Sequence, residues 1–575
     1  MSHERTRLKI PQLSDVPVSV RAELAEFSPT MQLLLWQAGF DDKKAVASFI
    51  NPSYEDSLHD PLLLHDIGKA TKAIVRAVDH RQKIAIFSDY DCDGIPGAVV
   101  LHDFFTAIKH ENFINYIPHR HYEGFGLSIA AVEKLAKDGV ELIITIDCGV
   151  TDVEAVARAN ELGVAVIITD HHEPGETLPD ALAIVNPKLG KYPFPNLCGA
   201  AVAFKLAKAV MQVSSYQVTP GQEKWWLDMV GLATIADMVP LVDENRTLAL
   251  YGLKVLQKSR RPGLQHLLRL AKTSQRFITE DDIGFTVGPR INAASRMDAP
   301  EQALNLLINQ DEVEAGVLAR DLEKLNNERK GSVAALTRQL HQKVYGLVEV
   351  PPVLVFGDNT WRPSLVGLVA GKLAEEYQRP AFIWGRDGNN VIKGSARSGG
   401  GVSVLALMQQ VPEAFLGFGG HQEAGGFSVA DEQVIALADS LVAAHGRLAG
   451  AEERVEITSQ TWDIKAELEW SDLFTQLPQE LFQLAPFGVG NEKPLFVFRP
   501  EAPSAVVSFG KQQEHTRLTF VTPKGAIEAI AFFTTPDQFR VTPTVGVANT
   551  VLGYLEVSYW RGRREVRVRL VEILP

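Results

Sequence analysis

Five short apolar runs between residues 84 and 185 organise the first half of the chain. They are rich in β-branched residues, and stretches with helical spacing separate them. Runs of this kind are typical of parallel strands that are buried between helices. The predicted strands are 84–87, 113–117, 142–146, 164–169 and 181–185. The pattern therefore predicts an open α/β domain, a class that binds its ligands at the carboxyl edge of the sheet.

Apolar residues at helical spacing predict the helices around and beyond these strands. The longest predicted helix covers 311–345, and at 1.5 Å per residue it would extend roughly 50 Å, enough to join two lobes. Other helices are predicted at 23–40, 96–108 and 227–239, and two more are predicted to begin at Asp66 and Cys198.

A second α/β module and a β-rich end follow the long helix. The module is predicted to have strands 353–356 and 381–384 around a helix at 364–376. Strands of the β-rich end are predicted at 517–521, 526–533, 550–560 and 565–574. We therefore expect a helical lead-in at 1–60, a parallel-sheet domain at 61–300, a connecting helix at 301–345, a smaller α/β domain at 346–460 and a β domain at 461–575.

Composition restricts the class of protein. A chain of 575 residues is too long for one core, and 46% hydrophobic with 22% charged residues indicates a globular protein. Without an apolar run of membrane-spanning length or a signal-peptide core, and with only three cysteines, we expect a cytoplasmic protein. The net charge of −13 argues against a wholly basic nucleic-acid-binding surface but leaves room for a local basic channel.

Acids and histidines follow three of the predicted strands: Asp89, Asp91 and Asp93, then Asp147, then Asp170, His171 and His172. Strand ends of a parallel sheet share one edge, so these side chains should converge. Carboxylates packed together repel unless protons or cations neutralise them. Oxygen ligands with a histidine suit Mg²⁺ or Mn²⁺, and two such ions can clamp a phosphoester during hydrolysis.

Two other interpretations of this cluster stay open. An isolated Asp-Cys-Asp-Gly is an ordinary turn signal. The second interpretation is a zinc site formed by Cys92, Cys148 and the histidine pair, although the sequence contains no CxxC pair.

Further charged residues are predicted to lie in places where they need an oppositely charged partner. Arg120 follows the second predicted strand and so comes to the acidic edge of the sheet, where a functional contact and a structural salt bridge are both reasonable. Asp237 lies in an apolar predicted helix, so it needs either a metal or a buried cation. Residues 287–296 are predicted to form a loop that carries Arg290 and Arg296.

The second module and the β domain offer basic or glycine-rich candidates. Ser395 and Arg397 precede the glycine-rich segment 417–426, which would allow backbone approach to phosphate or would be a flexible surface loop. Near the end of the chain, residues 561–564 contain three arginines beside Tyr559 and Trp560, and Arg567 and Arg569 alternate on the next strand. This stretch suits a platform for single strands or a solvated hairpin.

The order Asp-Tyr-Asp-Cys-Asp-Gly, Ile-Asp-Cys-Gly, Thr-Asp-His-His resembles the DHH phosphoesterase superfamily. Arg120 with Glu123-Gly124-Phe125-Gly126-Leu127 is similar to its branch of single-strand-specific exonucleases. Residues 417–426 match the GGHxxAxG signature of the DHHA1 domain, and 485–494 are similar to a segment that precedes the family's OB domain. The resemblance implies a parallel-sheet DHH domain, a long helix, a smaller α/β DHHA1 domain and a C-terminal β-barrel of the OB fold.

This resemblance implies hydrolysis of single-stranded DNA from the 5′ end to mononucleotides, in DNA repair and recombination, with Mn²⁺ or Mg²⁺. By family roles, Asp91 and Asp147 would hold one ion and Asp93, Asp147, His171 and Asp237 the other. Asp89 and Asp170 would be ligands or would orient ligands, and His172 would contact the scissile phosphate. The remaining substrate contacts implied are Arg120, Arg290, Asn292, Arg296, Ser395, Arg397, Gly420 and His421.

The partner implied is single-stranded DNA with a 5′ end, bound by a monomer, with a single-strand-binding protein and a helicase as candidate protein partners. The alternatives are a DHH phosphodiesterase for short oligoribonucleotides or cyclic dinucleotides, a pyrophosphatase, and a DNA-binding scaffold without activity. Pro96 and Ser295 depart from the family pattern, which often has Thr and Gly there.

Overall fold

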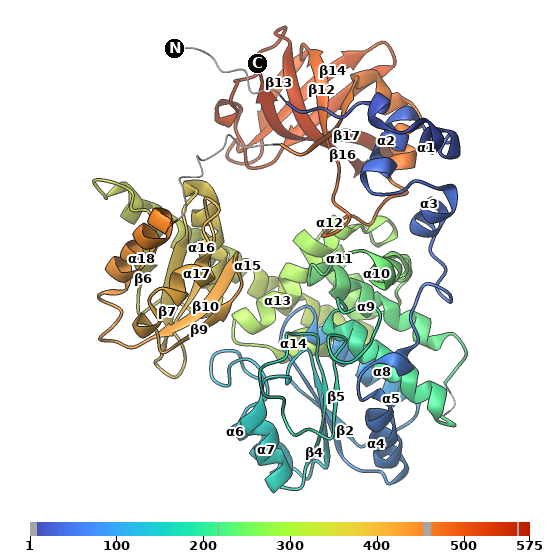
Figure 1. The fold of residues 1–575 in the computed structure, drawn as a ribbon, viewed down its shortest axis with the longest axis vertical. Helices are drawn as coiled ribbons and strands as arrows, with labels where there is room; N and C mark the ends of the chain where they lie inside the picture. The colour runs from blue at the N-terminus through green and yellow to red at the C-terminus, as the bar shows by residue number, and fades with distance from the viewer. Residues whose placement is uncertain (1–7, 217, 452–461, 561–562) are drawn as a thin grey trace. The chain divides into compact units, whose positions relative to one another are not determined.

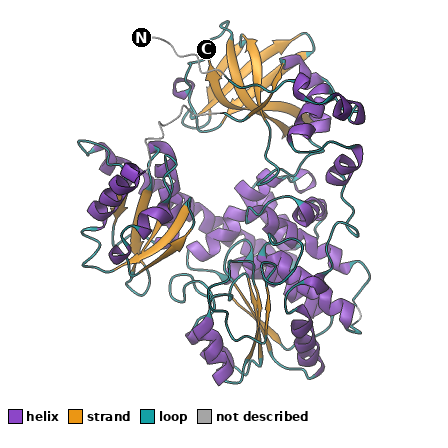
Figure 2. Cartoon of the chain, viewed as in Figure 1, coloured by secondary structure: helices purple, strands orange, loops and turns teal. Residues whose placement is uncertain are grey.

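The computed structural model describes residues 8–216, 218–451, 462–560 and 563–575, which divide into two compact units (Figure 1). The first unit comprises Met1–Leu58, Pro240–Leu250 and Thr458–Pro575. The second comprises His59–Val239 and Tyr251–Ile457 and contains two sheets (Figure 2). No helix among the described residues is long and apolar enough to cross a membrane.

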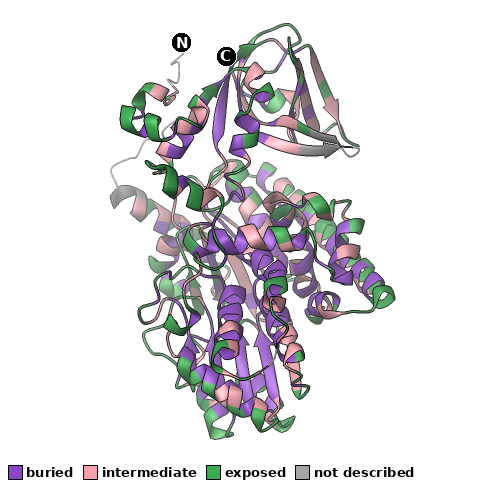
Figure 3. Cartoon of the chain, turned by 90° about the vertical axis from the view of Figure 1, so that its right-hand side faces the viewer, coloured by how far each residue is buried: buried purple, intermediate pink, exposed green. Residues whose placement is uncertain are grey.

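The first sheet of the second unit is parallel, with the strand order β2-β1-β3-β4-β5. β1 and β3 are buried along their whole length, as their apolar sequences require. Figure 3 shows these strands enclosed by helices. The strands are β1 (Ile84–Ser88), β2 (Phe113–Tyr116), β3 (Leu142–Ile146), β4 (Ala165–Thr169) and β5 (Ala183–Val185).

Helices cover both faces of this sheet (Figure 1). α6 and α7 share one buried apolar cluster with alternate residues of the strands. α4, α5 and α8 pack together on the other face. These helices are α4 (Ile67–Asp79), α5 (Gly94–Ala107), α6 (Ile129–Lys137), α7 (Val153–Glu161) and α8 (Gly199–Val213).

A helical layer follows, and the long predicted helix is one continuous element of 34 residues. Its members are α9 (Leu227–Ala236), α11 (Pro262–Leu270), α12 (Glu280–Asp282), α13 (Gly288–Arg296), α14 (Glu301–Ile308) and α15 (Glu312–Tyr345). α10 (Asp243–Leu256) begins in the first unit and ends in the second.

Two expectations for this layer were wrong. Residues 287–296 are not a loop, because a π-helical turn (Ile283–Val287) leads directly into α13. Pro289 lies in the first turn of α13, where a missing N–H costs no hydrogen bond, so the Gly-Pro pair begins a helix. Asp237 is not inside a helix, because α9 ends at Ala236 and Asp237 is the residue that caps it.

The second sheet of this unit is mixed, with the order β6-β7-β8-β10-β9. The glycine-rich segment is a β-hairpin, because β9 and β10 pair on either side of a short turn. Its elements are β6 (Leu354–Gly357), α16 (Pro363–Tyr377), β7 (Ala381–Arg386), β8 (Ile392–Arg397), α17 (Val404–Gln409), β9 (Gly417–Gly420), β10 (Ala424–Val429) and α18 (Leu437–Ala451).

The first unit is built on a seven-stranded sheet with the order β11-β12-β16-β17-β15-β14-β13. Its strands are β11 (Ile464–Leu468), β12 (Leu495–Glu501), β13 (Ala505–Phe509), β14 (His515–Thr522), β15 (Gly525–Ala531), β16 (Asn549–Trp560) and β17 (Arg563–Leu574). Its helices are α1 (Val18–Glu23), α2 (Pro29–Gln37), α3 (Lys43–Ile50) and α19 (Leu477–Leu481).

The N-terminal helices share their core with this C-terminal sheet. Met31 and Leu35 of α2 belong to one apolar cluster with Phe498 and Phe520. Glu480 accepts hydrogen bonds from the Ser28 backbone N–H, at 3.0 Å, and from the Ser28 hydroxyl. The helix expected at 23–40 is interrupted at Ser28, because Pro29 starts α2.

Candidate active site

Three carboxylates stand in a row across the edge of the parallel sheet. Ser88 pairs with Ile146, and Ile146 pairs with Thr169. The next residue of each strand is an aspartate: Asp89, Asp147 and Asp170. All three are buried, so the sheet register itself brings the acids together.

Asp147 lies at the centre of this row. Its φ of +61° places it in the left-handed region, which turns the chain sharply after β3. A Cβ atom at Gly199, the first residue of α8, would come within 2.6 Å of the Asp147 Cβ. Glycine there lets α8 approach the carboxylate closely. The Oδ1 atom of Asp147 lies 3.1 Å from His171 Nε2.

Asp93 joins the sheet edge to α8. Its two carboxylate oxygens accept the N–H groups of Gly199, at 2.6 Å, and Ala200, at 2.8 Å. These donors belong to the N-terminus of a helix, which favours negative charge. His171 Nε2 lies 3.6 Å from Asp93 Oδ2 and 3.7 Å from Asp237 Oδ2.

Asp91 and Asn292 shape the turn after β1. Asp91 Oδ1 accepts the Asp93 N–H at 2.8 Å, and Asn292 Oδ1 accepts the Cys92 N–H at 2.8 Å. The chain after Ser88 is therefore a turn and not a continued strand. Asp89, Asp91 and Asp93 are therefore brought together by this turn, and not by the alternation of side chains along an extended strand.

The carboxylates of this cluster repel one another when they are charged. Burial, followed by the neighbouring carboxylates, raises the pKa of Asp89 and of Asp147 well above the usual range. Burial, Asp93 and Asp91 raise the pKa of Asp237 to about 9. Asp89 Oδ1 and Asp147 Oδ1 are buried and have no hydrogen-bond partner among the described residues. These oxygens need cations, and the donor set of carboxylates with one imidazole fits Mn²⁺ or Mg²⁺.

The potential ligand atoms form three overlapping groups, each with members within 4.8 Å of one another. Asp89, Asp91 and Asp147 form one, and Asp93, His171 and Asp237 form the second; Asp147, His171 and His172 form the third. Asp147 and His171 each occur in two of the groups, and Asp147 Oδ1 lies 3.1 Å from His171 Nε2, so Asp147 lies between two candidate cation positions. These groups contain no cysteine, and burial raises the pKa of Cys92 and Cys148, which disfavours the zinc alternative.

His172 is held by Asp170. Asp170 Oδ1 lies 2.8 Å from His172 Nδ1 and accepts the backbone N–H groups of His171 and His172. Burial alone would raise the pKa of Asp170, but these hydrogen bonds hold that pKa below the ordinary value. Asp170 is also outside the three ligand groups, so its hydrogen bonds suit a role in orienting the His172 ring.

Arg120 and Arg296 lie near these acids, and neither forms an ion pair with a carboxylate among the described residues. The Arg120 guanidinium lies 4.8 Å from the centre of the Tyr90 ring. Arg296 Nη1 donates to the Ser364 carbonyl at 2.5 Å. Burial and the charges of Arg120 and Arg329 lower the pKa of Arg296 to about 9, so an anion there would relieve repulsion.

Arg397 lies against the same helix, α16, that Arg296 contacts. A Cβ atom at Gly367 would come within 3.2 Å of Arg397 Nη2 and 3.0 Å of Ser395 Oγ. Gly367 is three residues after Ser364 and thus on the same face of α16. Burial lowers the pKa of Arg397. The structure therefore brings Arg296, Ser395 and Arg397 to one side of one helix.

Other predicted substrate contacts have different surroundings. Arg290 Nε donates to Glu323 of α15 at 2.6 Å, with a second bond from Nη2 at 3.2 Å, so its guanidinium is engaged. Asn292 is engaged by Cys92, as described above. Gly420 and His421 lie at the exposed end of the β9–β10 hairpin, where Gly420 has a φ of +137°.

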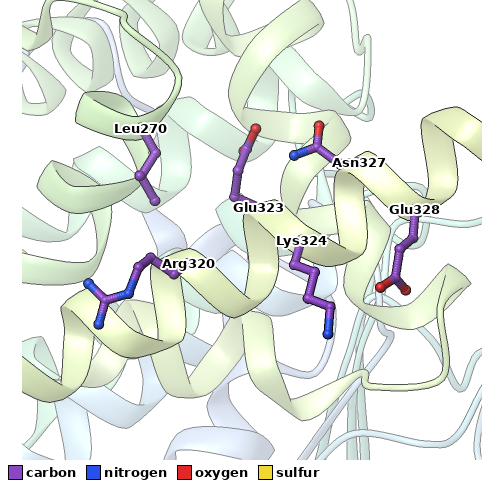
Figure 4. A pocket seen from close by; sticks show the side chains of 6 residues that line it. All are labelled: Leu270, Arg320, Glu323, Lys324, Asn327 and Glu328. Atoms are coloured by element: carbon purple, nitrogen blue, oxygen red, sulfur yellow. The ribbon is translucent and has the colours of Figure 1, made fainter.

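A hollow on the surface of α15 does not belong to this site. It lies between α15 and the end of α11, and none of the ligand candidates lines it (Figure 4). Its lining is of mixed charge, and the Glu323 carboxylate there is bound to Arg290.

The arginines that we expected to bind DNA in the β domain are paired or not described. Arg567 and Arg569 both lie within ion-pair distance of Glu556, at 3.1 and 3.7 Å. The side chains of residues 558–564, including Tyr559 and Trp560, lie outside the described residues.

Sequence reasoning missed two residues at the site. Asn186 is buried and follows β5 directly; its Nδ2 donates to the His172 carbonyl at 3.0 Å, and its Oδ1 accepts the Lys188 N–H. Its place after a strand was the available signal. Arg329 adds a positive charge near Arg296, but an arginine in a long polar helix carries no such signal.

Comparisons with known proteins agree along the chain. Family models match residues 83–234 (DHH family, N-terminal domain), 350–444 (DHHA1 domain) and 464–572 (RecJ OB domain). The single-stranded-DNA-specific exonuclease RecJ of Bacillus subtilis is 31% identical, with 99% of this chain and 71% of the relative covered. RecJ of Haemophilus influenzae is 31% identical, and the match covers 90% of this chain and 92% of that relative.

A solved structure resembles the whole fold. The crystal structure of RecJ in complex with Mn²⁺ from Thermus thermophilus has a TM-score of 0.80 at 27% identity. The match covers 99% of this chain and 79% of that one. The predicted fold class, with a parallel-sheet domain, a second α/β domain and a C-terminal OB domain, is confirmed.

Proposed function

The chain belongs to the RecJ family of single-stranded-DNA-specific exonucleases, and from this premise we propose that it hydrolyses single-stranded DNA from the 5′ end to mononucleotides. The reaction depends on Mn²⁺ or Mg²⁺ and serves DNA repair and recombination. The relatives' activity and the Mn²⁺ and Mg²⁺ complexes of the Thermus protein support the substrate and the metals.

The observation that carries the proposal is the row of buried carboxylates with unsatisfied oxygens at the sheet edge. Asp89, Asp91 and Asp147 would hold one cation, and Asp93, His171 and Asp237 the other. Asp147 would also reach the second cation, since its Oδ1 lies 3.1 Å from His171 Nε2. When bound, the two ions supply positive charge to the scissile phosphate and make a water acidic enough to attack it.

His172 would contact the scissile phosphate. Its Nδ1 is committed to Asp170, so Nε2 is the ring atom that would contact an oxygen of the scissile phosphate. Asn186 holds the carbonyl of His172 and so fixes the backbone beneath the ring.

Arg120, Arg296, Ser395 and Arg397 would bind the terminal 5′ phosphate. Guanidinium groups form bidentate, charge-assisted bonds with phosphate, and the hydroxyl adds a neutral donor. The shared contact with α16 supports a common pocket for Arg296, Ser395 and Arg397. Such a pocket accepts a chain end and makes cleavage exonucleolytic. Arg290 and Asn292 would support this site through Glu323 and Cys92.

The hairpin with Gly420 and His421 would contact the phosphates of the strand, and the OB domain would bind single-stranded DNA by stacking and phosphate contacts. We propose that the protein acts in the cytoplasm as a monomer. A single-strand-binding protein and a helicase would supply its substrate by covering and unwinding DNA.

One digestion series tests polarity, product and metal. A single-stranded oligonucleotide labelled at either end is incubated with Mn²⁺, with Mg²⁺ or with a chelator. A 5′ label should leave at once as a mononucleotide, whereas a 3′ label should stay in a shortening ladder. Early release of the 3′ label, internal cuts, or unchanged activity in chelator would overturn the proposal. A linear diribonucleotide and a cyclic dinucleotide test the alternative substrate class.

A further inference from the structure

Asp298, which follows α13, contacts two basic side chains from distant parts of the chain. Its Oδ1 lies 3.1 Å from His121 Nε2, and its Oδ2 lies 2.9 Å from Arg362 Nη1. His121 is a buried residue of the loop after β2, whereas Arg362 is half-exposed at the N-cap position of α16. One carboxylate therefore joins the loop after β2 to the start of α16.

Two of these contacts lie beside residues that we place at the 5′ phosphate. His121 directly follows Arg120, and Asp298 is two residues after Arg296. The loop after β2 and the end of α13 each supply one guanidinium to the proposed pocket, and the contact between His121 and Asp298 holds these two segments together.

The third segment at this carboxylate is α16, which leads to the rest of the pocket. Arg362 is two residues before Ser364. The Ser364 hydroxyl donates to the Arg296 carbonyl at 2.9 Å, in addition to the bond from Arg296 Nη1 to the Ser364 carbonyl. Gly367, one turn later, is the residue that the two phosphate candidates of β8 approach. Asp298 thus lies where all three segments of the proposed pocket meet.

The loop after β2 contacts the second α/β domain at one further place. Asn389 Nδ2 donates to the Tyr122 carbonyl at 3.0 Å, and a Cβ atom at Gly388 would come within 2.3 Å of the Tyr122 ring. This contact does not involve Asp298, so it should keep the loop on the domain when the Asp298 contacts are removed.

The backbone at Asp298 suits a short polar side chain. Its φ of +69° is in the left-handed region, which aspartate and asparagine adopt more readily than most residues with a side chain. Asp298→Asn therefore changes the charge and leaves the backbone conformation acceptable. An amide has one oxygen, so it cannot accept from His121 and Arg362 at the same time.

We propose that Asp298 is a positioning residue for the 5′-phosphate pocket, because it sets the segments that carry the phosphate ligands at a separation that one phosphate can bridge. The inference rests on the function proposed above. Charge-assisted bonds to phosphate need every donor at hydrogen-bond distance at once, so a small displacement of one segment costs binding. Asp298 acts through its two partners and does not touch the phosphate.

The competing explanation is that Asp298 contributes only its negative charge. A carboxylate near the pocket repels a phosphate, so its removal would then strengthen the preference for a 5′-phosphorylated strand. Positioning predicts the opposite, because the loss of alignment weakens that preference. The two explanations therefore differ in the sign of one measured ratio.

The test measures kcat/KM with Mn²⁺ on single strands of one sequence that carry a 5′ phosphate or a 5′ hydroxyl. Asp298→Asn should lower the ratio of the two values about ten- to a hundredfold and change the rate on the 5′-hydroxyl strand little. In chelator, fluorescence anisotropy should show the same loss in the ratio of the Kd values. The variant should melt within about 4 °C of the wild type, because a half-exposed ion pair adds little stability.

Variants of Arg362 complete a cycle with Asp298. Arg362→Gln should also lower the ratio, whereas Arg362→Lys keeps the charge and should retain most of it. The double variant Asp298→Asn with Arg362→Gln should be no worse than the larger single loss, since both changes break one contact. If charge alone mattered, the two changes would offset each other and the double variant would return toward the wild type.

Asp431→Asn is the matched control. Asp431 forms an ion pair with Arg386 within the second α/β domain, so this change also removes a carboxylate from an arginine. It should leave the ratio unchanged.

A ratio in Asp298→Asn equal to or above that of the wild type would overturn the inference alone, provided that the wild type prefers the 5′ phosphate and Arg397→Ala loses that preference. No preference in the wild type would remove the proposed phosphate pocket and the inference with it. If Asp298→Asn does not fold, Arg362→Gln and Arg362→Lys decide, and an unchanged ratio in both overturns the inference.

Discussion

His172 Nδ1 lies 2.8 Å from Asp170 Oδ1, and the same oxygen accepts the backbone N–H groups of both histidines. This arrangement makes Nδ1 the protonated nitrogen, since a carboxylate oxygen only accepts. Burial alone would lower the pKa of His172, but the hydrogen bond with Asp170 raises it. We therefore propose that Asp170 orients the ring, whereas the sequence left its role open between ligand and orienter.

Asp170→Asn should reduce kcat by about a hundredfold, because an amide can present a donor to Nδ1 and turn or retautomerise the ring. Mn²⁺ affinity should change little, since Asp170 is outside the three ligand groups. Single-turnover rates and calorimetric Mn²⁺ titration measure the two effects. Asp180→Asn, at an exposed acid, is the control. If Asp170→Asn lost Mn²⁺ affinity, Asp170 would instead be a metal ligand.

Asp147→Asn should abolish hydrolysis and yet stabilise the metal-free protein. Asp147 is buried among four other carboxylates that raise its pKa, so an uncharged amide removes repulsion. In chelator the variant should melt above the wild type, whereas Mn²⁺ should raise the melting temperature of the wild type far more. A variant that keeps a tenth of the wild-type rate with Mn²⁺ contradicts the shared-ligand role.

The pH dependence of the metal-free protein follows from the same carboxyls. The pKa of Asp237 is raised from 3.8 to about 9 in the folded protein. As pH rises, the unfolded chain therefore loses this proton at a lower pH than the folded protein does. Stability from this group is full below 3.8 and is lost as pH rises toward 9. In chelator, the melting temperature should fall between pH 6 and pH 9 by less in Asp237→Asn than in the wild type. An equal fall in both proteins would contradict the assignment.

The acidic row was predictable because strand patterning and sheet topology both determine it. Apolar runs located β1, β3 and β4, and the common direction of parallel strands placed Asp89, Asp147 and Asp170 together. The turn after Ser88 was not predictable in detail, because Asn292, which holds it, comes from a helix 200 residues later. Contacts of such separation leave no local pattern.

Local signals also misled where tertiary contacts decide. Gly288 and Pro289 suggested a loop, yet they begin α13, which packs against α15. The helices of residues 18–50 carried no sign that their apolar faces are covered by the C-terminal sheet. A helical pattern indicates that a face is buried and does not indicate its partner.

Arg290→Ala should lower stability and leave the preference for a 5′ phosphate intact. Its bidentate pair with Glu323 is largely buried, and loss of such a charged bond costs about 1.5–3 kcal/mol. Glu323→Ala should cost a similar amount, and the double variant little more than either, which urea denaturation can measure. Selective loss of activity on 5′-phosphorylated strands in Arg290→Ala would place Arg290 in the phosphate pocket instead.

Arg397→Ala should reduce the rate on 5′-phosphorylated single strands far more than on 5′-hydroxyl strands. Arg397 is half-buried on β8, beside Gly367 of α16, and has no carboxylate partner among the described residues. A phosphate is the charge that would satisfy it, and one lost charged hydrogen bond costs about 1.5–3 kcal/mol, or roughly ten- to a hundredfold. Arg386→Ala is the matched control, because Arg386 lies on the neighbouring strand β7 and pairs with Asp431. Equal losses on both substrates would remove Arg397 from the phosphate pocket, since a residue that binds only the strand cannot sense its terminal group.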